Sequence, residues 1–73
     1  MAEAAEHGGR TIDPQSYETD GGQWRPKAIV ATHEGGSVHT LPIVAHLDTT
    51  FATEAEANAY AVEMAKKWID ERG

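Results

Sequence analysis

A glycine pair, Gly35-Gly36, constrains the fold of this 73-residue chain more than any other feature. The pair separates two runs that are rich in β-forming residues, residues 23–33 and residues 38–51. Because glycine adopts the positive φ angles that a tight two-residue turn requires, the pair predicts a β-hairpin. In that hairpin Glu34 faces Ser37, and every other cross-strand pair follows from this one.

The hairpin register sorts the two strands into an apolar face and a mixed face. The apolar face carries Trp24, Pro26, Ala28, Val30, Leu41, Ile43, Ala45 and Leu47. The mixed face carries Arg25, Lys27, Ile29, Ala31, Thr40, Pro42, Val44 and His46. A slip of one residue would scramble the two sets, so the pattern itself supports the register. Because proline lacks a backbone N–H, Pro26 and Pro42 are expected at an edge or at a position without a ladder bond.

Residues 53–72 predict a C-terminal helix. Thr53 and Glu56 have the spacing of a capping box, which satisfies free N–H groups at a helix start. The face expected to pack on the sheet comprises Ala57, Ala61, Met64, Ala65 and Trp68, with Tyr60 and Ile69 at its margins. On the outer side of the helix, two pairs of opposite charges have the four-residue spacing that allows ion pairs. They are Glu63 with Lys67 and Lys66 with Asp70. Trp68 is expected to anchor the core.

The rest of the chain completes an α+β fold. Residues 1–8 are polar and alanine-rich and predict a disordered N-terminal tail. Arg10 to Ile12 predict a short first strand that ends at Asp13-Pro14. We therefore expect a single domain over residues 9–73, a three-stranded antiparallel β-meander with one C-terminal helix packed on one face. Such a sheet leaves a long edge exposed, which is either a liability or an interface.

Composition narrows the classes of partner. The chain has 12 acidic and 6 basic residues and a net charge of -6, which disfavours nucleic acid and anionic membranes as partners. It has no cysteine to form a disulfide or a thiolate metal site. A chain this short is marginally stable alone, so a homodimer is a plausible source of extra stability. With no apparent signal peptide or membrane span, we expect a cytoplasmic location.

Catalytic and metal-binding patterns are weak in this sequence. The two histidines beside the hairpin turn, His33 and His39, point to opposite faces in the expected register. A metal site needs three or four convergent ligands, so no metal or other cofactor is expected. Asp48 has the setting of a turn residue and lacks a partner nucleophile or base. We therefore expect a protein that is not an enzyme and has no catalytic residues.

The candidate site lies on the mixed face of the hairpin. Five residues of that face form the site and combine basic and apolar groups: Arg25, Lys27, Ile29, Val44 and His46. The leading hypothesis is a non-enzymatic interaction module that binds a protein partner or a second copy through this face or the sheet edge. The alternative is a nucleic-acid-binding regulator that uses Arg25 and Lys27, although stacking aromatics are missing from the face. A small enzyme is the third and weakest hypothesis.

Three short stretches carry a resemblance to known proteins. They are residues 21–25 (GGQWR), 51–57 (FATEAEA) and 67–73 (KWIDERG). Together they resemble small bacterial proteins grouped as HlyU-like, and short bacterial domains of unknown function with the same strand–strand–helix order. The resemblance covers about residues 10–73, with Thr53 as the Ser/Thr position of the helix start. It implies a transcriptional regulator, but it places no catalytic or DNA-reading residue on this sequence.

Overall fold

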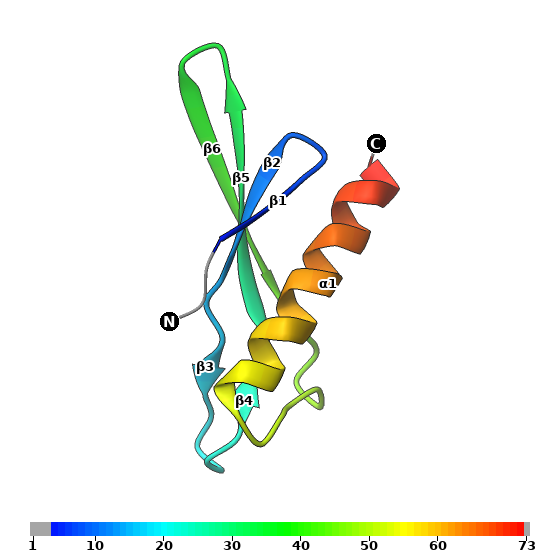
Figure 1. The fold of residues 1–73 in the computed structure, drawn as a ribbon. Coiled ribbons are helices and arrows are strands. Elements are labelled where there is room, and N and C mark those ends of the chain that lie inside the picture. The colour runs from blue at the N-terminus through cyan, green and yellow to red at the C-terminus, as the bar shows by residue number, and fades with distance from the viewer. Residues whose placement is uncertain (1–3, 73) are drawn as a thin grey trace.

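A computed structural model describes residues 4–72 of the chain as an α+β fold (Figure 1). Four strands form an antiparallel sheet in the order β1-β2-β5-β6, and two short strands, β3 and β4, pair separately. The elements are β1 (Ala5–His7), β2 (Arg10–Pro14), β3 (Tyr17–Glu18), β4 (Trp24–Arg25), β5 (Lys27–Glu34), β6 (Ser37–Val44) and α1 (Glu54–Arg72). The expected α+β class with a C-terminal helix is confirmed, but the sheet has four strands rather than three.

The central hairpin has the register that the glycine pair predicts. Glu34 faces Ser37, Thr32 faces His39 and Val30 faces Leu41 along the whole of β5 and β6. Gly35 and Gly36 have φ angles of 50° and 87°, which L-residues with side chains rarely adopt. The prediction is confirmed because the turn and the apolar pattern specify the same pairing.

The additional strand lies in the segment that was expected to be a disordered tail. Residues 1–3 lie outside the described part of the chain, whereas Ala5–His7 pair with β2 as strand β1. A second glycine pair, Gly8-Gly9, makes the turn with φ angles of 58° and 79°. Ala5 packs against the core. The turn signal was the same as in the central hairpin, but the strand before it is short and polar.

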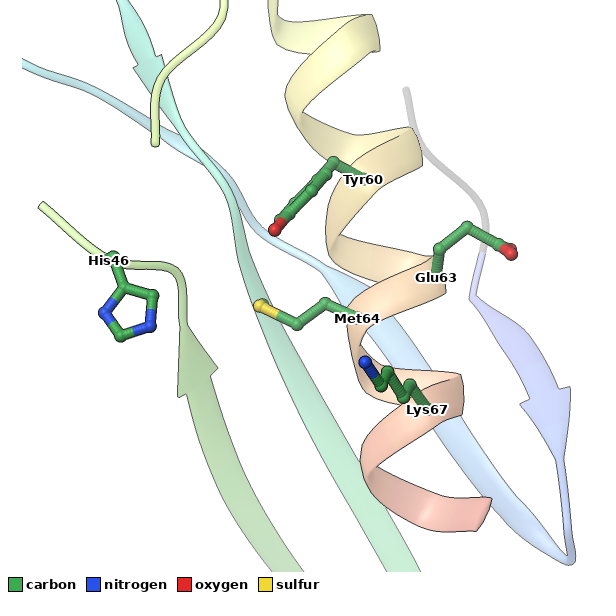
Figure 2. Close-up of a pocket in the computed structure, with 5 residues that line it drawn as sticks. All are labelled: His46, Tyr60, Glu63, Met64 and Lys67. Carbon is green, nitrogen blue, oxygen red and sulfur yellow. The ribbon is translucent and has the colours of Figure 1, made fainter. Parts of the chain in front are cut away.

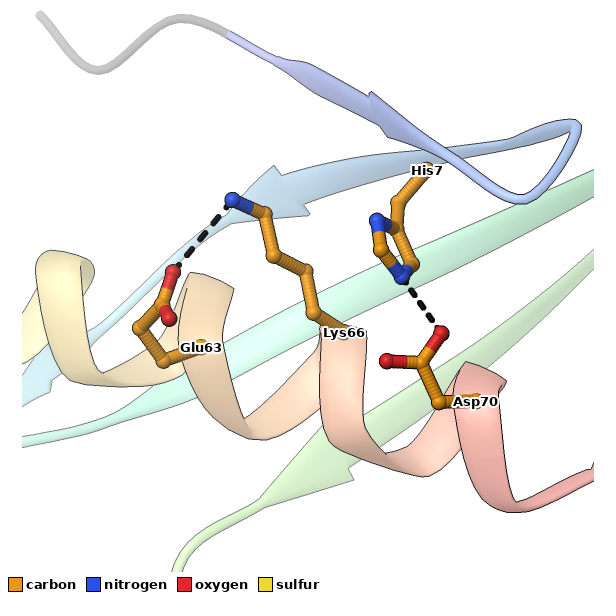
Figure 3. A network of polar contacts seen from close by, with 4 residues as sticks. All are labelled: His7, Glu63, Lys66 and Asp70. Atoms are coloured by element: carbon orange, nitrogen blue, oxygen red, sulfur yellow. Dashed lines mark hydrogen bonds and ion pairs between the residues drawn. The ribbon is translucent and has the colours of Figure 1, made fainter.

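The edge strand β1 is also joined to the helix by a polar contact (Figure 3). His7 Nε2 lies 2.7 Å from Asp70 Oδ1. In the same region Lys66 Nζ lies 3.3 Å from Glu63 Oε2. Lys66 and Asp70 were expected to pair with each other, but β1 supplies His7 to the aspartate and the lysine turns to Glu63.

The hydrophobic core lies between α1 and the middle of the sheet. Its buried cluster comprises Ile12, Ala28, Val30, Ala61, Ala65 and Ile69. Trp68 was expected to anchor this core, but it is only partly buried, and its ring lies 4.5 Å from the guanidinium carbon of Arg72. Ile69 takes the central position because the buried line of the helix advances four residues at a time from Ala57 to Ile69.

The start of α1 follows the predicted capping box. Thr53 Oγ1 accepts a hydrogen bond of 3.2 Å from the backbone N–H of Glu56. The same hydroxyl donates to Glu56 Oε1 at 3.0 Å. Thr53 therefore satisfies one of the free donors of the first turn, and acidic Glu54 and Glu56 lie at the positive end of the helix dipole.

Candidate interaction surface

Strand β6 is the exposed long edge of the sheet. It pairs with β5 on one side, and no strand within residues 4–72 pairs with its other side. Helix α1 packs mainly on β2 and β5. A helix is about 10 Å wide and neighbouring strands lie about 4.8 Å apart, so one helix covers about two strands of a sheet. The fourth strand is consequently left open on both faces (Figure 1).

The backbone groups at the free edge of β6 can be assigned from the hydrogen-bond alternation. The N–H of Ala45 donates to the carbonyl of Pro26 at 3.0 Å. In an antiparallel ladder every second residue bonds to the same neighbour, so the odd-numbered residues of β6 face β5. The residues that direct their backbone groups outward are Val38, Thr40, Pro42 and Val44. Pro42 therefore lies at the edge, as expected for a residue without an N–H.

Exposed apolar side chains gather on β6. Val38 is 57% exposed, Leu41 is 44% exposed and Val44 is 48% exposed. Leu47, three residues beyond the strand, is 81% exposed. Single exposed apolar residues are common on protein surfaces, but several along one free strand mark an interaction site or an aggregation risk.

These apolar side chains occupy both faces of the strand. Leu41 pairs with Val30, which is buried beneath α1, so Leu41 lies on the helix side of the sheet. Val44 pairs with Lys27 and lies on the opposite side, which we term the open face. Within β5 and β6 the open face comprises Lys27, Ile29, Ala31, His33, Val38, Thr40, Pro42 and Val44. A partner that approaches the edge would therefore meet apolar side chains above and below its own strand.

A pocket of about 360 Å³ lies between α1 and the end of β6 (Figure 2). Its lining residues are His46, Tyr60, Glu63, Met64 and Lys67. Figure 2 shows Tyr60, Met64 and Lys67 reaching from the helix toward the sheet, while the carboxylate of Glu63 points away. The ring centroids of Phe51 and Tyr60 lie 5.3 Å apart. The pocket therefore combines the apolar groups of Tyr60 and Met64 with the polar groups of His46, Glu63 and Lys67.

The five residues of the predicted site do not form one surface. Lys27, Ile29 and Val44 share the open face. Arg25 belongs to β4, and its guanidinium donates to Tyr17 Oη at 3.0 Å and to the carbonyl of Leu47 at 3.2 Å. His46 instead lines the pocket beside α1, because the chain turns after β6.

The site residues that sequence reasoning missed are Val38, Leu41 and Tyr60. Leu41 was assigned to the buried face, and its side of the sheet is correct. It is nevertheless exposed, because the helix does not extend over the edge strand. The relation between sheet width and helix width could have indicated this, but only if the fourth strand had been recognised.

Within residues 4–72 no three His, Cys, Asp or Glu side chains are grouped to hold a metal ion. Asp48 lies in a turn in which the N–H of Thr49 donates to the carbonyl of His46 at 2.9 Å. No helix among these residues is long and apolar enough to cross a membrane.

Comparison with known proteins identifies the family. The family described as "Domain of unknown function (DUF6566)" matches residues 1–73. Searches of the curated proteins and of the solved structures found no match. The findings agree with the resemblance to a short domain of unknown function and show no link to HlyU-like proteins. Because the match spans the whole sequence, this chain belongs to the DUF6566 family.

Proposed function

We propose that this chain is a non-enzymatic protein-interaction module that binds its partner through β6. The observation that carries the proposal is the concentration of exposed apolar side chains on a strand with a free edge. Of the six large apolar residues that are exposed in the described chain, Val38, Leu41 and Val44 belong to β6.

Strand addition is the binding mode that fits this edge. In that mode a partner strand forms backbone hydrogen bonds, which supply affinity, while alternating side chains supply specificity. The free N–H groups of Val38, Thr40 and Val44 are directed outward. The apolar side chains on both faces would cover the alternating side chains of the added strand.

The nucleic-acid-binding regulator implied by the HlyU-like resemblance has less support. Two donors of Arg25 are engaged by Tyr17 and Leu47, so the guanidinium is held against the protein. The net charge of -6 repels phosphates at long range. Lys27 remains on the open face, but His46 lies elsewhere, so the expected group of three cations is dispersed.

Site-specific photo-crosslinking in the native cells tests the proposal. A benzophenone amino acid is placed at Thr40 on β6, and the matched control carries it at Ala59, which is exposed on α1. We expect discrete protein adducts from position 40 and few from position 59. The proposal fails if position 40 gives no more adducts than position 59. A crosslink to nucleic acid instead of protein would favour the regulator.

A further inference from the structure

We propose that the partner of β6 is a second copy of the chain, paired antiparallel about a two-fold axis at Leu41. This inference rests on the proposed function and specifies its partner. It follows from the order of hydrogen-bonding groups and apolar side chains along one strand. When a strand pairs with its own copy about a two-fold axis, its backbone groups and its apolar side chains must both match those of the same strand read in the opposite direction from the axis.

The first requirement is that the free backbone groups match. With Leu41 opposite Leu41 of the second copy, Val38 faces Val44 of the second copy and Thr40 faces Pro42 of the second copy. These outward-facing positions are the hydrogen-bonded pairs of the new ladder. The outward N–H groups of Val38, Thr40 and Val44 then each meet a carbonyl. Because Pro42 has no N–H, the carbonyl of the Thr40 that faces it is the one outward carbonyl among these pairs that receives no hydrogen bond.

The two neighbouring registers form fewer backbone hydrogen bonds between the copies, each for a different reason. If the axis moved to Pro42, two prolines would face each other at a hydrogen-bonded position, where neither has an N–H to donate. If the axis moved to Thr40, Val44 would lie opposite the turn residue Gly36 and would have no strand partner. Only the axis at Leu41 lets all three outward N–H groups of β6 meet a carbonyl of the partner strand; Pro42 disfavours one neighbouring register and the end of the strand disfavours the other.

The second requirement is that the side chains match. In the proposed register Leu41 meets itself on the helix side, and Val38 meets Val44 on the open face. The three exposed apolar side chains of β6 are thereby all covered by apolar side chains. The strand sequence SVHTLPIV contains no Asp, Glu, Lys or Arg, so no like charges face each other across the axis. Edge strands of monomers commonly carry such charges to prevent pairing.

The small core of the monomer also favours pairing through β6. Its buried cluster relies on Ala28, Ala61 and Ala65, which contribute little apolar area, and a single helix covers about half of the sheet. Pairing through β6 would give an eight-stranded sheet with both helices on the same face, because paired residues share a face. Leu41 and Ile43 of both copies would then lie on the face of the sheet that carries the two helices. The dimer adds apolar burial where the monomer lacks it.

Cysteine crosslinking of the purified full chain tests the register. The chain has no native cysteine, so each introduced thiol is unique. In the proposed dimer, position 41 faces itself in a non-hydrogen-bonded pair. The Cα separation of such pairs, about 4.5 Å, lies within disulfide range. Position 39 faces position 43 of the second copy. The two positions 39 of the dimer are offset by about four residues, or roughly 13 Å, along the strands.

We expect Leu41→Cys to form a disulfide dimer under mild oxidation on the order of a thousandfold faster than Ala59→Cys, because pairing raises the effective thiol concentration from micromolar to millimolar. His39→Cys and Ile43→Cys should each form little disulfide-linked dimer separately and should crosslink when the two variants are mixed. Equal rates for Leu41→Cys and Ala59→Cys would overturn the dimer. Rapid crosslinking of His39→Cys alone would overturn the register.

Hydrogen exchange of the unmodified chain provides a test without substitutions. Raising the protein concentration should slow exchange most at the N–H groups of Val38, Thr40 and Val44, because dimerisation gives these groups a new hydrogen bond and gives helix amides only the general gain in stability. No concentration dependence up to millimolar protein would also overturn the dimer. If that result accompanied β6 crosslinks to a different protein, the interaction module would stand and only the identity of its partner would be wrong. Without such crosslinks, both proposals would fail.

Discussion

His7 Nε2 lies 2.7 Å from Asp70 Oδ1 and joins the first strand of the sheet to the last turns of α1. The two residues are 63 positions apart in the sequence. At the residue after His7, a Cβ atom added at Gly8 would lie 3.0 Å from Ile69 Cγ2. The polar contact and the close approach together hold β1 against the end of the helix.

Replacing His7 with alanine should release β1 more than it destabilises the fold. The contact is largely exposed, so its loss should lower the free energy of unfolding by at most about 1 kcal/mol. Amide exchange at Ala5, Glu6 and His7 should nevertheless become faster, because a three-residue edge strand has few other anchors. Hydrogen exchange read by NMR and urea denaturation measure the two effects. Unchanged exchange in β1 would mean that Ala5 packing alone holds the strand.

Truncation of the buried isoleucine should cost more than removal of the tryptophan. Ile69 is 2% exposed in the core cluster, so Ile69→Val should lower the free energy of unfolding by about 0.5–1.5 kcal/mol. Ile69→Ala should cost about 2–5 kcal/mol, enough to unfold much of so small a domain. Trp68→Ala removes a partly buried ring and its contact with Arg72, and we expect a smaller loss than for Ile69→Ala. Urea denaturation measures the loss of unfolding free energy for each variant. A larger loss for Trp68→Ala than for Ile69→Ala would show that Trp68, rather than Ile69, anchors the core.

The helix cap should contribute a measurable part of the stability. Thr53→Ala removes the acceptor of the Glu56 N–H and should lower the free energy of unfolding by about 1 kcal/mol. Thr53→Ser keeps a hydroxyl at the same position and serves as the matched control. Thermal unfolding followed by helix circular dichroism measures both variants. Equal losses for alanine and serine would show that the hydroxyl is not what stabilises the helix start.

The turn of the central hairpin should tolerate no side chain at its second position. Gly36 has a φ of 87° and open space around the position of a Cβ, so the effect of Gly36→Ala is due to backbone strain alone. We expect a loss of about 1–2 kcal/mol. Gly21 also has open space but no positive φ, so Gly21→Ala should change stability by less than about 0.5 kcal/mol. A neutral Gly36→Ala would mean that the turn adopts another conformation.

The sequence predicted correctly the turn and the helix cap, because each is determined by residues that are close together in the chain. Gly35-Gly36 and Thr53 specify a turn and a cap within a few residues of themselves, and both predictions are confirmed. The roles of Trp68 and Ile69 depend on which side of α1 meets the sheet, and helical periodicity places these two neighbours too close together to decide between them. The buried line that the packing selects runs through Ala57, Ala61, Ala65 and Ile69. The sequence of β1 is too short and polar to indicate a strand, so the fourth strand was missed.

The candidate site was predicted only in part for a related reason. The register placed Lys27, Ile29 and Val44 on one face, which the pairing confirms. Arg25 was counted as a free cation because Tyr17 and the carbonyl of Leu47, its partners, are distant in sequence. Strand alternation assigned His46 to the same face, but alternation ends with β6 at Val44. A side chain beyond a strand end follows the path of the loop.

Salt should distinguish self-association from nucleic-acid binding. Each copy carries a net charge of -6, so two copies repel each other at low ionic strength. Salt screens this repulsion with a Debye length of about 10 Å at 0.1 M, and the dimer should therefore strengthen as sodium chloride is raised. Binding to phosphates releases counterions and weakens with salt, so the opposite trend is expected for a nucleic acid. Sedimentation equilibrium at several salt concentrations, alongside fluorescence anisotropy with a mixed-sequence oligonucleotide, measures both trends.

Glu34→Gln removes the acidic residue that faces the first residue of β6 and should make the dimer less dependent on salt. A dimer that weakens with salt would mean that specific ion pairs, rather than the backbone and apolar contacts of β6, hold the copies together.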